Sequence, residues 1–159
     1  MKTALLRSAA LAVCVFGASE AIAGGEIFAP PNQAVTLGGT ITSLGTSVAG
    51  KWVAEVFAGA GECLRVQVLT QFADLEAVVV APDGTVFRND DTNGAANRRP
   101  LVKIQGTPDS GWYTVSIGVY NGDAKSGNFT VSYGRYYLPN ANCNNPTPPT
   151  EAAGAEVKK

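Results

Sequence analysis

The feature that most constrains this chain is an alternation of apolar and polar residues, which extends from about residue 35 to residue 137. In KWVAEVFA, for example, Trp52, Ala54 and Val56 fall on one face and Glu55 falls on the other. A period of two is the signature of β-strands, because successive side chains of a strand point to opposite faces. No convincing helical stripe interrupts it. The pattern recurs in CLRVQVLT (63–70), DLEAVVVA (74–81), GWYTVSIGVY (111–120) and NFTVSYGRYY (128–137).

Shorter segments complete a set of seven or eight expected strands. TVF (85–87) follows a turn at Pro82-Asp83-Gly84, LVKIQ spans 101–105, and AVTLGGTIT (34–42) is a weaker strand because two glycines interrupt it. Short strands at near-regular spacing predict an all-β fold, an antiparallel β-sandwich of jelly-roll type. The predicted core residues are Trp52, Ala54, Val56, Leu64, Val66, Val68, Leu75, Ala77, Val79, Tyr113, Val115, Ile117, Val119, Phe129, Val131 and Tyr133.

The two ends of the chain differ from this middle part. Residues 1–23 have the form of a secretory signal peptide, with Lys2 and Arg7, a short apolar run and an Ala21-Ile22-Ala23 cleavage site. That run is too short to span a bilayer, so the mature form is predicted to have no membrane span. Cys14 gives a weak likeness to a lipoprotein box, but the bulky Val13 before it favours ordinary cleavage.

These features divide the chain into four parts. After the signal peptide (1–23) we expect an extended lead-in (24–34), a sandwich domain (35–138) and a tail (139–159) rich in Pro, Asn and Ala. The tail shows no periodicity and is predicted to be largely disordered beyond Cys143. The whole protein is expected to be exported, to the periplasm or the medium.

Cysteine usage fits an exported protein. Cys14 leaves with the signal peptide, and the mature chain keeps Cys63 and Cys143. In an oxidising compartment two cysteines favour one disulfide, here closing a loop of about 80 residues. The alternative is two separately buried thiols.

Composition excludes several classes of function. The chain has no histidine, which excludes Ser-His-Asp and Cys-His catalysis and histidine-ligated zinc. Cleavage removes two of the 12 basic residues and one of the 13 acidic ones, leaving a net charge near −2. Nucleic acids and anionic membranes require a dense basic surface, so neither is expected as a partner.

Five motifs in order resemble the bacterial pre-peptidase C-terminal domain family. They are Ala60-Gly61, Asp74-Leu75 through Pro82 and Gly84, Asn89-Asp90-Asp91, Gly111 with Tyr113, Val115 and Ile117, and Phe129 with Val131 and Tyr133. The resemblance covers about residues 35–137. It implies a small jelly-roll-like sandwich without catalytic activity, of a kind usually attached to exported enzymes, and in collagenase relatives such domains bind calcium and collagen. No peptidase sequence accompanies the domain here.

The resemblance and the composition together predict an exported, non-catalytic binding or accessory module. Its partner would be a protein or polysaccharide of the cell envelope or medium. The alternative is a structural or interaction protein of the periplasm without a ligand of its own. A third hypothesis, a carboxylate hydrolase, is disfavoured because Asp90 and Asp91 are adjacent, and a strand would direct them to opposite sides.

The stretch VFRNDDTNGAANRRP (86–100) is the candidate metal site. Calcium binds six to eight oxygens, commonly from Asp, Asn and carbonyl groups. The predicted side-chain ligands are Asp74, Asp90, Asp91 and Asn93. Against this, Arg98 and Arg99 follow closely, and the lead-in offers only Glu26 as a further acid. The alternative is a plain loop in which Asn, Asp and Gly satisfy turn backbones.

Aromatic residues could also form a binding face. Tyr120 points outward by alternation, and Tyr136 and Tyr137 follow the last expected strand. These three tyrosines are the candidate face for a sugar or peptide, although such residues also cap sandwich ends. Trp52 and Trp112 are predicted to be structural.

Overall fold

The protein folds as a sandwich of two β-sheets in a computed structural model that describes residues 23–43, 50–92 and 96–150. The predicted signal peptide (1–23) therefore lies outside the described residues except for Ala23. The strands are β1 (Ala23–Ile27), β2 (Gln33–Ile41), β3 (Trp52–Ala58), β4 (Cys63–Thr70), β5 (Leu75–Val80), β6 (Val86–Asn89), β7 (Leu101–Gln105), β8 (Gly111–Val119), β9 (Gly127–Tyr136) and β10 (Pro149–Thr150).

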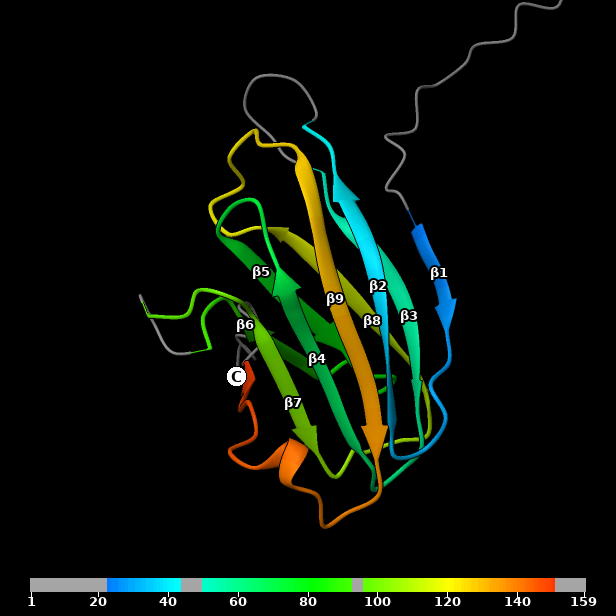
Figure 1. The fold of residues 1–159 in the computed structure, drawn as a ribbon. Coiled ribbons are helices and arrows are strands. Elements are labelled where there is room, and N and C mark those ends of the chain that lie inside the picture. The colour runs from blue at the N-terminus through cyan, green and yellow to red at the C-terminus, as the bar shows by residue number, and fades with distance from the viewer. Residues whose placement is uncertain (1–22, 44–49, 93–95, 151–159) are drawn as a thin grey trace, which may run out of the picture.

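The first sheet has the order β1-β3-β8-β5-β6-β10, and the second has the order β2-β9-β4-β7. Figure 1 shows the two sheets stacked face to face, with β1 at one edge of the first sheet beside β3. Nearly all pairs are antiparallel; the exception among the described strands is β1, which runs parallel to β3. The predicted all-β sandwich is confirmed.

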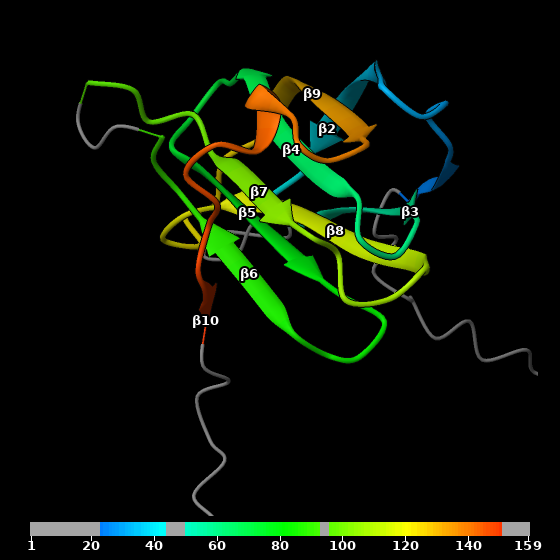
Figure 2. The same cartoon turned by 90° about the horizontal axis from the view of Figure 1, so that it is seen from below.

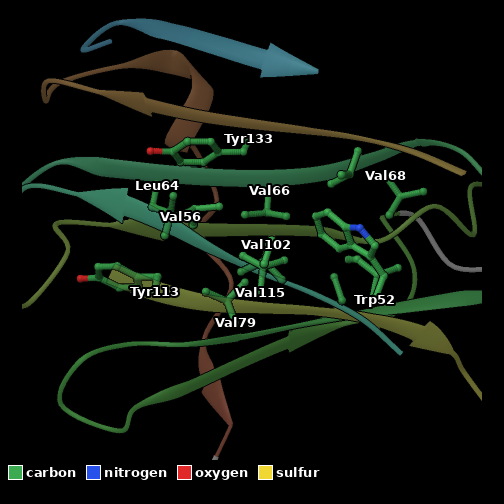
Figure 3. Close-up of a cluster of buried hydrophobic side chains, with 14 of the residues drawn as sticks. Trp52, Val56, Leu64, Val66, Val68, Val79, Val102, Tyr113, Val115 and Tyr133 are labelled. Atoms are coloured by element: carbon green, nitrogen blue, oxygen red, sulfur yellow. The ribbon is translucent and has the colours of Figure 1, made fainter. Parts of the chain in front are cut away.

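The core fills the space between the sheets. All sixteen residues predicted from the alternation to face inward are buried. Figure 3 shows them meeting from both sides, with Trp52, Val79, Tyr113 and Val115 from the first sheet and Val66 and Tyr133 from the second. Burying such side chains contributes roughly 1.5–3 kcal/mol each for the large ones, which is why the alternation determines the strand faces so strongly.

The structure describes the predicted tail (139–159) as far as Thr150. After β9 the chain forms a short 3-10 turn, η1 (Ala141–Cys143), and then crosses to the first sheet. Thr147 exchanges bonds with Lys103 of β7: its amide donates to the Lys103 carbonyl at 2.9 Å, and the Lys103 amide donates to Thr147 Oγ1 at 3.0 Å. Figure 2 shows this segment passing β7 and ending as β10 beside β6. Residues 144–150 are thus ordered, while 151–159 lie outside the described residues.

A disulfide joins Cys63 at the start of β4 to Cys143 in η1, with 5.9 Å between the two Cα atoms. Both cysteines are fully buried, in a small cluster with Tyr136 and Leu138. The predicted pairing is therefore present, and it fixes the start of the C-terminal segment to the second sheet. Within the described ranges, no helix is long and apolar enough to cross a membrane.

Candidate functional site

The 86–100 stretch, the candidate metal loop, is held mainly by its own polar groups. Asn89 accepts a bond from the Leu101 amide at 2.9 Å and donates to the Asp91 carbonyl at 3.1 Å. The Thr92 amide donates to the Arg99 carbonyl at 3.2 Å, which closes the loop. These are the bonds expected of a plain loop between β6 and β7.

The two arginines of this loop tie it to the β4–β5 connection. Arg99 Nη1 donates to the Leu69 carbonyl at 2.8 Å, and Arg98 Nη1 lies 3.3 Å from Asp74 Oδ2. Asp74, the predicted ligand outside the loop, therefore already pairs with a cation through one oxygen. Its other oxygen, Oδ1, is buried and has no hydrogen-bond partner among the described residues.

The predicted calcium ligands do not form a metal cluster in the described part of the chain. No group of three or more Cys, Asp or Glu side chains there could hold a metal ion. Asp90 and Asp91 are half-buried, and Asn93 lies outside the described residues. The residues that are described therefore do not fit a calcium cage, and calcium binding stays a prediction.

The three candidate tyrosines do not form one face. Tyr120 directly follows β8, near the start of β9, whereas Tyr136 ends β9 and Tyr137 follows it. Since β9 has ten residues, about 30 Å separates the two places. Tyr136 is only 8% exposed and covers the disulfide, so it is not available to a partner.

A different aromatic group lies on the outer face of the first sheet. Phe28 follows β1, Phe57 belongs to β3 and Trp112 belongs to β8, and the β3–β8 register places Phe57 directly across from Trp112. The ring centroids are 5.5 Å apart for Phe28 and Phe57 and 5.6 Å apart for Phe57 and Trp112. Phe28 is 57% exposed and Trp112 39% exposed. We call these three residues the aromatic row.

A buried ion pair lies against two rings of the aromatic row. The Arg135 guanidinium lies 5.1 Å from the Phe28 ring centroid and 5.0 Å from that of Phe57. Its Nη2 donates to Glu62 Oε1 at 3.0 Å, and its Nε lies 2.9 Å from Oε2, close enough for a charge contact. Glu62 Oε2 in turn accepts a bond from the Gly59 amide at 2.8 Å. Arg135 thus contacts the rings through cation–π interactions, and Glu62 holds the guanidinium in place by a charged hydrogen bond.

The outer face is acidic two residues before Phe28 and Phe57 in the chain. Glu26 of β1 is in register with Glu55 of β3, and Glu55 is opposite Thr114 of β8. The Thr114 hydroxyl donates to Glu55 Oε1 at 2.8 Å. A shallow depression of about 230 Å³ lies beside Glu26 and Glu55. We call Glu26 and Glu55 the acidic row.

The sequence interpretation missed the aromatic row for an identifiable reason. Phe28 falls in the predicted lead-in, and Trp112 is predicted to be structural. The strand alternation does put Phe57 and Trp112 on outward positions, which was an available signal. Their adjacency, however, depends on the β3–β8 register, and that of Phe28 depends on the parallel β1–β3 pairing.

The titratable groups with shifted pKa values are structural ones. Burial raises the pKa of the Tyr133 phenol, which donates to the Phe57 carbonyl, and burial likewise raises the pKa of Tyr113, which donates to the Asp109 carbonyl. Burial and the neighbouring Arg65 charge lower the pKa of Lys103, whose amine donates to the Asn144 carbonyl. Each of the three groups thus donates to a backbone carbonyl.

Two grooves, of about 530 and 490 Å³, flank the C-terminal segment where it crosses β6 and β7. The first is lined by Arg88, Lys103 and uncharged residues, and the second has Asp83 as its sole acid. Carboxylate hydrolysis needs two acids that face each other across a cleft. Neither groove provides this pair.

Comparisons with known proteins give no match to any family model and no match among curated sequences. Among solved structures the chain is similar to PliG of Aeromonas hydrophila, a periplasmic inhibitor of g-type lysozyme, with a TM-score of 0.48 and 14% identity over 70% of this chain and 96% of that chain. PliG of Salmonella Typhimurium gives 0.47 and 11%, covering 70% and 99%.

The pre-peptidase C-terminal domain of a collagenase from Bacillus anthracis is also similar in structure. Its TM-score is 0.45 at 13% identity, over 71% of this chain and 93% of that chain. The family that the sequence motifs resemble is therefore represented among the solved structures that this chain is similar to. The similarity concerns the arrangement of strands, and no residue role is carried over from it.

Proposed function

We propose that this protein is an exported, non-catalytic module that binds a macromolecular partner through the outer face of its first sheet. The observation that carries the proposal is the aromatic row. Large aromatic side chains that remain exposed and adjacent on a folded domain mark interaction surfaces. Here two of the three rings are substantially exposed, and the ring of Phe57 contacts the other two, one after β1 and one in β8.

Rigid support distinguishes this surface from isolated exposed rings. The Arg135–Glu62 pair lies under Phe28 and Phe57, and both charged residues are buried. A partner that binds pre-positioned rings does not have to order them, so less side-chain entropy is lost on association. The geometry therefore suits a binding function better than a purely structural one.

The non-catalytic part of the proposal rests on chemistry. The sequence contains no histidine, and both mature cysteines are in the disulfide. The predicted acid pair, Asp90 and Asp91, lies in a loop that forms its own turn bonds. Export rests on the predicted signal peptide.

Site-directed photo-cross-linking tests the proposal. A benzophenone amino acid replaces Trp112 in one variant and Tyr120 in a matched control, and each is produced in the organism that encodes the protein. The two positions are equally accessible, at 39% and 41% exposed, but Tyr120 lies away from the aromatic row, after the opposite end of β8. We expect a discrete adduct from position 112 and none from position 120.

Each other outcome contradicts the proposal. A protein without a ligand of its own gives no adduct at either position. Equal adducts at both positions indicate random collision rather than a defined surface. The circular dichroism spectrum and the thermal midpoint of each variant show that the sandwich is intact, so a missing adduct is not due to unfolding.

A further inference from the structure

The acidic row and the aromatic row lie side by side on β1 and β3. Glu55 and Phe57 are two residues apart and share one face of β3. Phe28, directly after β1, follows Glu26 at the same spacing, and both side chains are exposed. The registers Glu26↔Glu55 and Phe57↔Trp112 align the two rows across the sheet. Adjacent positions on one face of a strand are about 7 Å apart, so a single partner side chain can contact both rows.

The net charge of this surface is negative. Arg135 beneath the rings is buried and compensated by Glu62. Arg88 on the same sheet is paired with Glu76, and the Lys51 side chain covers Gly118 toward the other end of β3 and β8. Among the described residues, then, no cation lies between the rows to neutralise Glu26 and Glu55.

The orientation of the rings disfavours a flat stacking ligand. Phe28 is tilted by 36° from Phe57, and Trp112 stands at 75° to Phe57. A row of sugar rings stacks best on aromatic faces that share one plane. Rings set at steep angles instead form pockets for individual apolar or cationic side chains, as in protein interfaces rich in Trp and Arg.

From these observations we infer that the partner is a protein segment in which lysine or arginine alternates with apolar side chains. This inference rests on the proposed function and names its partner class. The cations would pair with Glu26 and Glu55 and contact the outward ring faces, and the depression of about 230 Å³ beside the two glutamates has room for one such side chain. Charge complementarity of this kind mainly sets specificity and the association rate, and it weakens with salt.

NMR titration of the Trp112 indole N–H tests this inference. The chain has two tryptophans, and Trp112→Phe identifies the signal. The probes are a twelve-residue peptide of repeating Arg-Leu-Gly, the same peptide with Glu in place of Arg, and cellohexaose. We expect the basic peptide alone to shift the Trp112 signal, with a dissociation constant that rises at least threefold between 20 and 200 mM NaCl.

Matched double variants locate the binding charge. Glu26→Gln with Glu55→Gln is expected to weaken the basic peptide at least fivefold. Asp90→Asn with Asp91→Asn removes the same charge from the β6–β7 loop, beyond β8 and β5 in the first sheet, and is expected to change the affinity less than twofold. Equal losses in both variants would show a non-specific effect of net charge and would overturn the inference.

The remaining outcomes also decide the question. A shift with cellohexaose but not with the basic peptide identifies a polysaccharide partner, and equal binding of the acidic peptide removes the role of charge. No shift with any probe overturns the basic-partner inference as well. If the cross-link at position 112 still forms in that case, the binding surface stands and only its partner class is wrong.

Discussion

At the residue scale, the most informative feature is the buried pair of Arg135 and Glu62. Removing two charges from water is costly, and a buried pair is retained only where good geometry and further bonds compensate it. Here Glu62 also accepts the Gly59 amide, and Arg135 has two aromatic rings against its guanidinium. Arg135 Nε and Nη1 make no hydrogen bond among the described residues, so the pair is not fully satisfied. The cost of burying the pair is thus met at a place where Arg135 also contacts two rings of the aromatic row.

Arg135→Met tests how strongly the fold depends on the buried pair. Methionine keeps apolar contact with the rings but leaves Glu62 buried without its cation, so we expect the free energy of unfolding to fall by about 3–5 kcal/mol. Arg88→Met is the matched control, because Arg88 is exposed and also paired with a glutamate, and about 0–1 kcal/mol is expected. Urea denaturation measures both. Similar losses in the two variants would show that burial of the pair does not matter.

At the element scale, β2 shows how the second sheet accommodates a large aromatic residue. Gly39 is opposite Phe129 of β9, and a Cβ at position 39 would lie 2.3 Å from the Phe129 ring. The adjacent Gly38 has open space around its Cα. The two glycines made this strand the weakest in the sequence interpretation, yet one of them is required by packing across the strands.

Gly39→Ala is therefore expected to destabilise the protein by about 1–3 kcal/mol, because the Phe129 ring must move within a packed core. Gly38→Ala is the control on the same strand, and it should be neutral or slightly stabilising. Thermal denaturation followed by circular dichroism compares the two variants. If Gly39→Ala matches Gly38→Ala in stability, the close approach to Phe129 has no energetic importance.

The elements differ in how far the sequence predicts them. β3, β4, β5, β8 and β9 follow from alternation because each buries one face, and a shift of one residue would expose that face. β1 and β10 do not, since AGGEI and PT are too short and too rich in Gly and Pro to show a period. Both are held by pairing with β3 and β6, which is a tertiary effect.

The same distinction between local pattern and tertiary contact explains which parts of the candidate site the sequence predicts. The 86–100 loop was predictable as a loop because Asn, Asp and Gly favour turns. That Asp74 contacts Arg98 rather than its fellow acids depends on the packing of the β4–β5 connection against that loop. The aromatic row draws on three strands that are not consecutive in the chain. The alternation within single strands therefore does not predict a surface of this kind.

At the scale of the whole molecule, the disulfide connects the C-terminal segment to the sandwich. Cys143 is 80 residues from Cys63, and the segment that follows it covers the outer edges of β7 and β6. Closing a loop of that length reduces the entropy of the unfolded chain, which stabilises the fold in the chain-entropy model. The same link holds Thr147 near Lys103.

Cys63→Ala combined with Cys143→Ala is expected to lower the free energy of unfolding by about 4 kcal/mol. Hydrogen exchange should then report lost protection of the Thr147 amide, while amides of β8 keep theirs. Mass spectrometry without reductant provides the control on the wild-type chain, where the mass must be two hydrogens below that of the reduced form. Two free thiols in that measurement would contradict the link itself.

The order of the first sheet also determines how this domain can be anchored. β10 occupies one edge of that sheet and β1 the other, with β3, β8, β5 and β6 between them. An attachment made at Thr150, such as a resin linker or a fused enzyme, therefore lies at the edge of the sheet opposite to Glu26 and Phe28. Attachment at Thr150 would leave the acidic row and the aromatic row accessible to a partner. Attachment at β1 would place the linker or the fused enzyme beside these two rows and obstruct them.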